Sequence, residues 1–275
     1  MSENKRIHTA REEWNAYSNE YFAENASEEI VGRIIKDPSR AFPAPVRDMI
    51  RSAYPDIRGK KVLVPSSGDN AAVFAFHLLG AAVTSSDISE QQLKNAGQIA
   101  SAHGWDIRFV CDDSMSLTKI EDGNFDLVYT SNGVHVWIPD LLSMYRSFHR
   151  VLKKDGQYIM YEVHPVIRPF GDDEAPFITV RKPYENIDLT DDVPKFHWRI
   201  QDIFNAAFDA GFDITHMEEF HPGKKDHDLW FYKNKLQAEA DNYMKFDWKQ
   251  NPWAVLPQWI GFSARKRMVK TYEHH

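Results

Sequence analysis

The 275-residue chain has a single cysteine and no long apolar run. One thiol cannot form an internal disulfide and is typical of a reducing compartment, so we expect a cytoplasmic protein. No segment approaches the roughly 18 uninterrupted apolar residues of a membrane span, and no apolar stretch follows Met1–Arg6 as it would in a signal peptide. A membrane is therefore not expected as a partner.

Basic residues are fewer than acidic residues. The sequence has 33 Lys and Arg against 40 Asp and Glu, for a formal net charge of −7. A surface of this sign repels phosphate backbones, so nucleic acid is not expected as a partner either. The composition leaves the oligomeric state open. At 43% apolar residues, the chain can bury one large core or two small ones.

What the sequence does contain is a strand, a tight turn, a helix and a second strand ending in an acid. The segments are a strand over 61–65, a turn over 66–70, an apolar helix ending at Leu79 and a strand over 81–87. Gly68 allows a ligand to approach the turn, where backbone N–H groups at the helix start point outward. Asp87 ends the second strand, where its carboxylate can accept both hydroxyls of a ribose. The unit predicts a nucleoside site.

Two further predicted strands also end in polar residues. The strand over 105–110 leads to Asp113 and Ser114, and the strand over 125–130 leads to Ser131. In an open parallel sheet the ligand lies beyond the carboxyl ends of the strands. These ends therefore predict one pocket in an α/β fold.

Several motifs in this order resemble those of the class I S-adenosylmethionine-dependent methyltransferases, in particular the broad type 11 group of small-molecule enzymes. The motifs are Val83–Ser89, Val110–Leu117, Phe125–Val128 with Trp137–Asp140, Arg150–Tyr158 and Gly261–Lys266. The resemblance covers most of the chain. It implies a Rossmann-like, seven-stranded, mostly parallel sheet with helices on both faces.

The resemblance also implies S-adenosylmethionine as cofactor and assigns residues to it. Asp87 would hold the ribose, Ile88 would pack on the adenine, and Asp113 would accept a hydrogen bond from the adenine amino group. The backbone of Ser114 would meet the ring. We further expect Gln92 and Ser131, beside these motifs, to contact the cofactor.

The first motif departs from the family pattern. Val64 stands where an acid is usual, and Ser66 and Asn70 stand where glycine is usual. Ser66 can still present its backbone N–H, and Asp69 could supply the missing carboxylate for the amino group of the ligand. Two readings follow: a methyltransferase with a shifted methionine end, or a non-catalytic binding protein that keeps only the fold.

A nicotinamide dinucleotide is a less favoured alternative. Asp69 occupies the electropositive start of the helix, where an acid is stabilised by roughly 0.3–1 kcal/mol. A pyrophosphate at the same position would be repelled, whereas S-adenosylmethionine carries no phosphate. An oxidoreductase is therefore less favoured than a methyltransferase.

We expect four segments along the chain. They are an N-terminal helical lid over 1–58, the cofactor-binding core over 59–165, an insertion over 166–196, and the completion of the sheet over 197–275 with an aromatic-rich insertion at 221–257. In the first segment, Tyr17 and Tyr21 are candidates to close over the cofactor, although core packing would explain them as well. Both insertions should lie at the rim of the pocket, over the C-terminal edge of the sheet, and choose the acceptor.

The predicted reaction is in-line methyl transfer to a small molecule, with no metal. Positioning and exclusion of water can lower the barrier by up to roughly 7–11 kcal/mol, so a base is needed only for a protonated acceptor. His135 and His164 follow two strand ends and are candidates for that base. A structural role for either histidine is the simpler alternative.

Overall fold

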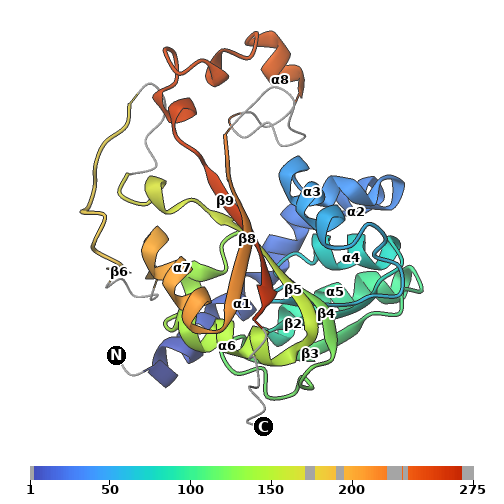
Figure 1. Cartoon of the computed structure of the whole chain (residues 1–275). Helices are drawn as coiled ribbons and strands as arrows, with labels where there is room; N and C mark the ends of the chain where they lie inside the picture. The colour runs from blue at the N-terminus through green and yellow to red at the C-terminus, as the bar shows by residue number, and fades with distance from the viewer. Residues whose placement is uncertain (1–2, 171–176, 190–194, 222–230, 232–234, 268–275) are drawn as a thin grey trace.

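The computed structural model describes residues 3–170, 177–189, 195–221, 231 and 235–267, and its centre is a seven-stranded sheet (Figure 1). The strand order is β3-β2-β1-β4-β5-β9-β8. The bounds are β1 Lys61–Pro65, β2 Ala82–Asp87, β3 Arg108–Cys111, β4 Phe125–Ser131, β5 Leu152–Val163, β8 Phe212–Phe220 and β9 Trp259–Lys266. The pairings of β1 to β5 are parallel, and β9 is antiparallel to both of its neighbours. The expected seven-stranded, mostly parallel α/β sheet is confirmed.

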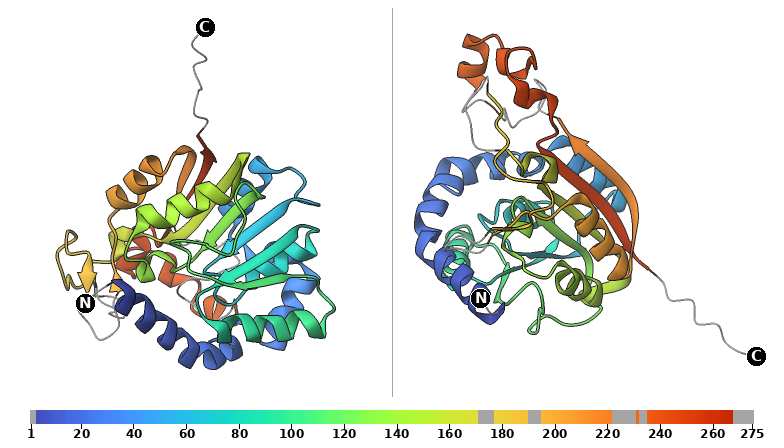
Figure 2. Two further views of the ribbon diagram at one scale, coloured as in Figure 1. Left: turned by 90° about the horizontal axis from the view of Figure 1, so that it is seen from below. Right: turned by 90° about the vertical axis from the view of Figure 1, so that its left-hand side faces the viewer.

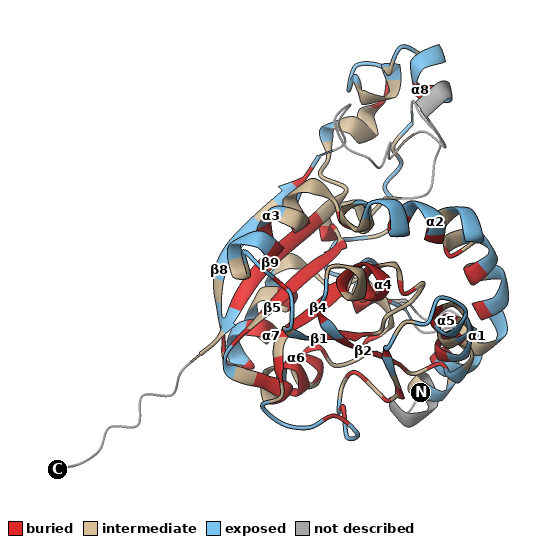
Figure 3. Cartoon of the chain, turned by 90° about the vertical axis from the view of Figure 1, so that its right-hand side faces the viewer, coloured by how far each residue is buried: buried red, intermediate tan, exposed pale blue. Residues whose placement is uncertain are grey.

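Helices cover both faces of this sheet and bury two separate cores (Figure 3). One face carries α2 Glu28–Lys36, α3 Ala44–Ala53, α4 Ala71–Leu78 and α5 Glu90–Ala102; the other carries α6 Leu141–Val151 and α7 Ile200–Asp209. Alternation along β1 supplies both cores, because Val62 and Val64 face one side while Leu63 faces the other. All three are buried, as expected for a central parallel strand.

Local signals in the sequence account for several element ends. The Ser89 hydroxyl accepts a hydrogen bond from the Gln92 backbone N–H (3.1 Å) and so caps the start of α5. The third strand begins at Arg108 rather than at Trp105, because Trp105 turns back to stack on His103, with ring centroids 4.6 Å apart. Pro38 begins the short helix η1 Pro38–Ala41 rather than only ending the helix before it.

Helix α1, Glu3–Asn25, and the two insertions lie around the C-terminal edge of the sheet. Helix α1 wraps past α5 along one edge of the molecule (Figure 2). The first insertion begins after η3 Pro165–Ile167 and contains β6 Asp188–Leu189 and β7 Lys195–Phe196. The second insertion contains α8 Lys235–Ala240, η4 Met244–Phe246 and η5 Pro252–Val255, and it projects beyond the ends of β8 and β9 (Figure 1). Trp230 and Tyr232, two of the aromatic residues expected there, are outside the described residues.

Gly261 tests how tightly the sheet packs against α3. A methyl group at this position would lie 2.9 Å from the Met160 carbonyl oxygen and 3.0 Å from the Phe220 ring. Gly261→Ala should therefore lower the free energy of unfolding by about 1–3 kcal/mol, measured by urea denaturation. Gly32→Ala is the matched control on exposed α2, where nothing lies within 4 Å; it should raise stability by about 0.5–1 kcal/mol. Equal effects of the two substitutions would contradict this packing.

Candidate functional site

A cavity of about 520 Å³ opens beyond the carboxyl ends of the central strands. Its walls come from the loops after β1, β2, β3 and β4, from the ends of β5 and β9, and from α1. It therefore spans the position between β1 and β4, where the order of the sheet reverses and ligands bind in open α/β sheets. Its size is within the usual range for a small-molecule site.

All but one of the predicted cofactor residues line this cavity. They are Ser66, Gly68, Asp69, Asp87, Ile88, Gln92, Asp113, Ser114 and Ser131. The exception is Tyr17, which is 41% exposed and is not part of the described lining. Trp14 and Tyr21 line the cavity instead, and Tyr17 packs against both rings. On α1, Tyr17 is about one turn from both Trp14 and Tyr21 and lies at the edge of the same helix face, where its ring is exposed.

The loop after β1 keeps a left-handed backbone without its usual glycines. Ser66, Gly68 and Asn70 have φ angles of 49°, 54° and 60°. Only glycine adopts such angles freely, so the other two residues need support from side chains. Asn70 donates to the Gly68 carbonyl (2.8 Å) and accepts from the Ser85 hydroxyl (2.6 Å), while the hydroxyls of Ser66 and Ser114 are 2.8 Å apart. Hydrogen bonds thus hold the turn that glycine would permit.

Two carboxyl groups in the cavity wall have no basic side chain facing them. Asp87 accepts from the backbone N–H groups of Ser89 (2.9 Å) and Gly68 (3.4 Å), and Asp69 accepts from that of Ala71 (2.9 Å) at the start of α4. Burial raises the pKa of each to about 6, although these hydrogen bonds act in the opposite direction. Among the described lining residues there is no Lys, Arg or His. The site is therefore electronegative and suited to a ligand that carries positive charge.

The two adjacent acids after β3 have different roles. Asp112 is buried and accepts from the backbone N–H of Lys119 (2.6 Å) and that of Asp113 (3.0 Å), so it holds the loop together. Asp113 and Met115 both line the cavity. The Asp113 carboxylate accepts a hydrogen bond from the Met115 backbone N–H (2.9 Å). Met115 was not predicted, because a methionine in a loop carries no distinct signal.

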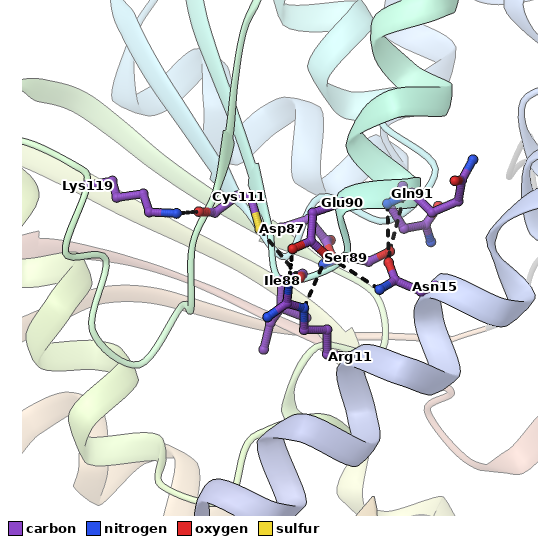
Figure 4. A network of polar contacts seen from close by, with 10 residues as sticks. Arg11, Asn15, Asp87, Ile88, Ser89, Glu90, Gln91, Cys111 and Lys119 are labelled. Carbon is purple, nitrogen blue, oxygen red and sulfur yellow. Dashed lines mark hydrogen bonds and ion pairs between the residues drawn. The ribbon is translucent and has the colours of Figure 1, made fainter.

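Helix α1 is fastened to the start of α5 by polar contacts (Figure 4). Arg11 pairs with Glu90, and the Asn15 side-chain oxygen accepts from the Ser89 hydroxyl (2.6 Å) and the Gln91 backbone N–H (3.2 Å). Ser89, Glu90 and Gln91 directly follow Asp87 and Ile88 in the chain. The position of α1 is thus coupled to the tip of β2.

Gln92, also at the start of α5, lines the cavity with a buried side chain. Its side-chain oxygen accepts a hydrogen bond from the Ser18 hydroxyl of α1 (2.9 Å), which adds a further polar contact between α1 and α5. Its Nε2 is buried and has no hydrogen-bond partner among the described residues, which costs free energy.

The two histidines considered as bases lie outside the described lining. His135 is 3% exposed, with its Nε2 3.0 Å from the Tyr145 hydroxyl of α6. His164 is 1% exposed, with its Nε2 2.9 Å from a Glu219 oxygen on β8. Burial lowers the pKa of both imidazoles. Each ring is buried and hydrogen-bonded within the protein, so a role as base remains a prediction.

A buried carboxylate organises the loop after β4. Glu162 is 2% exposed and accepts from three backbone N–H groups, those of Gly133 (2.6 Å), Val163 (2.7 Å) and His135 (2.9 Å). This loop turns through left-handed angles at Asn132 and Gly133. Sequence analysis missed Glu162; the available signal was one acid within the otherwise apolar end of β5.

Comparison with known proteins agrees with this geometry. Residues 65–156 match a family model described as a methyltransferase domain. An uncharacterized methyltransferase, YbaJ of Bacillus subtilis, is 30% identical over 187 residues, which are 62% of this chain and 72% of that protein. The chain therefore belongs to the class I S-adenosylmethionine-dependent methyltransferases.

Solved structures share the fold at lower identity. An S-adenosylmethionine-dependent methyltransferase from Mesorhizobium loti superposes with a TM-score of 0.58 at 24% identity, covering 79% of this chain and 96% of that one. A 1,6-didemethyltoxoflavin-N1-methyltransferase from Burkholderia thailandensis, solved with its acceptor and S-adenosylhomocysteine, has a TM-score of 0.58 at 14% identity, covering 98% and 92%. Within the described residues, no helix has the length and apolar character to cross a membrane, and no three metal-ligating side chains form a cluster.

The raised pKa of Asp87 predicts how stability depends on pH. Its ordinary value is 3.8 and the folded value is about 6, so between these the folded state holds a proton that the unfolded state has released. The free energy of unfolding should fall as pH rises through this window, by roughly 3 kcal/mol in total. Asp87→Asn should reduce the fall between pH 5 and pH 8, measured by urea denaturation without ligand.

The control for this experiment is Asp106→Asn, which changes an exposed carboxyl in the loop before β3. Its stability profile should follow that of the parent. An Asp87→Asn profile as steep as the parent's would show that Asp87 titrates normally.

Proposed function

We propose that this chain transfers a methyl group from S-adenosylmethionine to a small-molecule acceptor by in-line displacement. The observation that carries the proposal is a single cavity that joins a carboxylate-bearing half, at the ends of β1, β2 and β3, to an aromatic half, at the ends of β4, β5 and β9. The first half suits a positively charged nucleoside, and the second offers space beside it for an acceptor.

The side chains of the first half fit the cofactor group by group. The Asp87 carboxylate, at the tip of β2, would accept from the ribose hydroxyls. Ile88 and Met115 supply apolar surface for the adenine, and Asp113 would accept from its amino group. The Asp69 carboxylate would pair with the ammonium group, and the unpartnered Nε2 of Gln92 is available to donate.

The chain's part in the reaction is positioning. When bound, the cofactor supplies an already activated methyl group on sulfur. Trp14 and Trp137 contact each other with ring centroids 5.5 Å apart, which connects α1 to the loop after β4 across the cavity. Holding the acceptor and excluding water in this way can lower the barrier by up to roughly 7–11 kcal/mol. His135 and His164 are buried outside the described lining, so we do not assign either as the base.

The proposal of a small acceptor draws support from the cavity and from a structural neighbour. The volume of about 520 Å³ has to accommodate the cofactor and the acceptor together. The Burkholderia thailandensis neighbour was solved with a small acceptor, 1,6-didemethyltoxoflavin. A dinucleotide is disfavoured because the Asp69 carboxylate already occupies the start of α4.

Ligand binding separates the enzyme from a non-catalytic protein. S-adenosylmethionine and S-adenosylhomocysteine should both raise the melting temperature, and NAD should not; at 100 times the dissociation constant, a ligand adds about 2.7 kcal/mol of stability. Asp87→Ala should weaken both ligands about 10- to 100-fold by calorimetry, because a charge-assisted hydrogen bond is lost. Asp106→Ala should bind as the parent does. Unchanged affinity of Asp87→Ala would refute the ribose assignment.

The polar contacts of α1 predict a kinetic effect on the cofactor. We infer that α1 acts as a lid, which must separate from α5 before a ligand leaves. Asn15→Ala removes three hydrogen bonds of this interface, those with Ser89, Gln91 and Glu90, and should raise the dissociation rate of S-adenosylhomocysteine by about three- to tenfold, followed by stopped-flow tryptophan fluorescence. Glu13→Ala, on the exposed side of α1, should leave the rate unchanged. Equal rates for both variants would argue against the lid.

A further inference from the structure

We propose that the acceptor is an uncharged, flat ring compound held between aromatic side chains at the β4–β5–β9 end of the cavity. The inference rests on the proposed function, since it names the acceptor class for the same site. It draws on the charges of the cavity wall, on the aromatic side chains at this end, and on the polar groups between them.

The charges of the wall oppose an anionic acceptor. The described lining has three carboxyl side chains, Asp69, Asp87 and Asp113, and no basic side chain. A carboxylate or phosphate entering this cavity would lose its hydration without gaining a counter-ion from any side chain of the described lining, which is costly. Basic groups would have to line the site for an anion to bind well.

A cationic acceptor is excluded by the reaction. A protonated amine has no lone pair with which to form the new bond to carbon, and it would be repelled by the sulfonium of the cofactor. In the transfer, the lone pair or π electrons of the acceptor form the bond to the methyl carbon as the carbon–sulfur bond breaks and its electrons return to sulfur. An N–H or O–H proton of the acceptor leaves to water. The reaction thus excludes a protonated amine, and together with the lack of basic side chains in the described lining this favours a neutral acceptor.

The aromatic side chains at this end are fixed by their own packing. Tyr161 on β5 stacks on Phe220 with ring centroids 5.3 Å apart and lies 5.2 Å from Trp259 of β9. Trp137, in the loop after β4, also lines the cavity and packs edge-to-face on Trp14 of α1. Rings that are held in place before binding are suited to another flat ring, because little entropy is lost in ordering them.

The polar side chains beside these rings are uncharged. Ser131, Asn132 and Gln258 line the cavity at this end. Both N–H bonds of the Gln258 side chain are directed to backbone carbonyls, those of Trp253 (3.0 Å) and Leu256 (3.2 Å). Its carbonyl oxygen is left to accept from a hydroxyl or amine of a ligand. Such groups recognise a neutral heteroatom on a ring.

The test compares matched rings in the presence of saturating S-adenosylhomocysteine. The probes are 1-naphthol and quinolin-8-ol, each set against its carboxylated counterpart, 1-hydroxy-2-naphthoate and 8-hydroxyquinoline-7-carboxylate. Calorimetry on the full chain should give dissociation constants for the neutral rings at least about tenfold lower than for the carboxylates. Carboxylates that bind as tightly as the neutral rings would overturn the proposal, and so would the failure of both neutral rings to bind.

Two pairs of variants test whether the neutral rings bind in this cavity. Val163→Lys places a cation in the wall of the cavity and should reduce or reverse the preference for neutral rings, whereas Val255→Lys adds the same charge at an exposed position outside it. Trp137→Leu should weaken 1-naphthol about three- to tenfold, and Trp248→Leu, which removes an exposed tryptophan outside the lining, should not.

The variants and the cofactor control separate the possible failures. Equal behaviour within each pair of variants would place the rings elsewhere and contradict the proposal. If S-adenosylhomocysteine itself did not bind, the proposed function would fail instead, which keeps the two failures distinct.

Discussion

The turn after β1 is the constraint on which the site depends. Serine and asparagine hold left-handed angles there only because partners from two other strands fix them: the Ser85 hydroxyl on β2 reaches Asn70, and that of Ser114, after β3, reaches Ser66. Three strand ends are thereby tied into one hydrogen-bonded unit. Three buried hydroxyl residues lie on β2, Thr84, Ser85 and Ser86, and this turn explains the one at Ser85.

The carboxylates that make the cavity wall electronegative are held in place by hydrogen bonds, but their charged forms cost free energy when no ligand is bound. Asp69 and Asp87 are held by backbone N–H groups, yet burial raises the pKa of both to about 6, so their charged forms carry a cost in the ligand-free chain. A site of this kind recovers that cost when a cation enters it. Stability and function are therefore in opposition at these two positions, as is common at binding sites.

Much of the fold could be predicted from the sequence because the signals are local. The strand and helix pattern predicted an α/β fold, the resemblance implied its seven-stranded sheet, and the spacing from Gly68 to Asp87 predicted a nucleoside site at the tip of β2. The aromatic half could not be predicted in this way. Trp14, Trp137 and Trp259 come from three distant segments, and only the tertiary fold brings them to one cavity. Tyr17 and the two histidines fall on the correct elements, but their rings point elsewhere, which spacing alone does not determine.

The second insertion begins and ends at residues that the sheet already pairs. Phe220, at the end of β8, is opposite Trp259 at the start of β9, and the Gln258 backbone N–H donates to the Phe220 carbonyl (3.0 Å). The register of both strands is thus independent of the chain between them. Such a closed excursion can be lengthened or shortened without disturbing the pairing of β8 with β9, so the sheet sets little constraint on the sequence of the insertion.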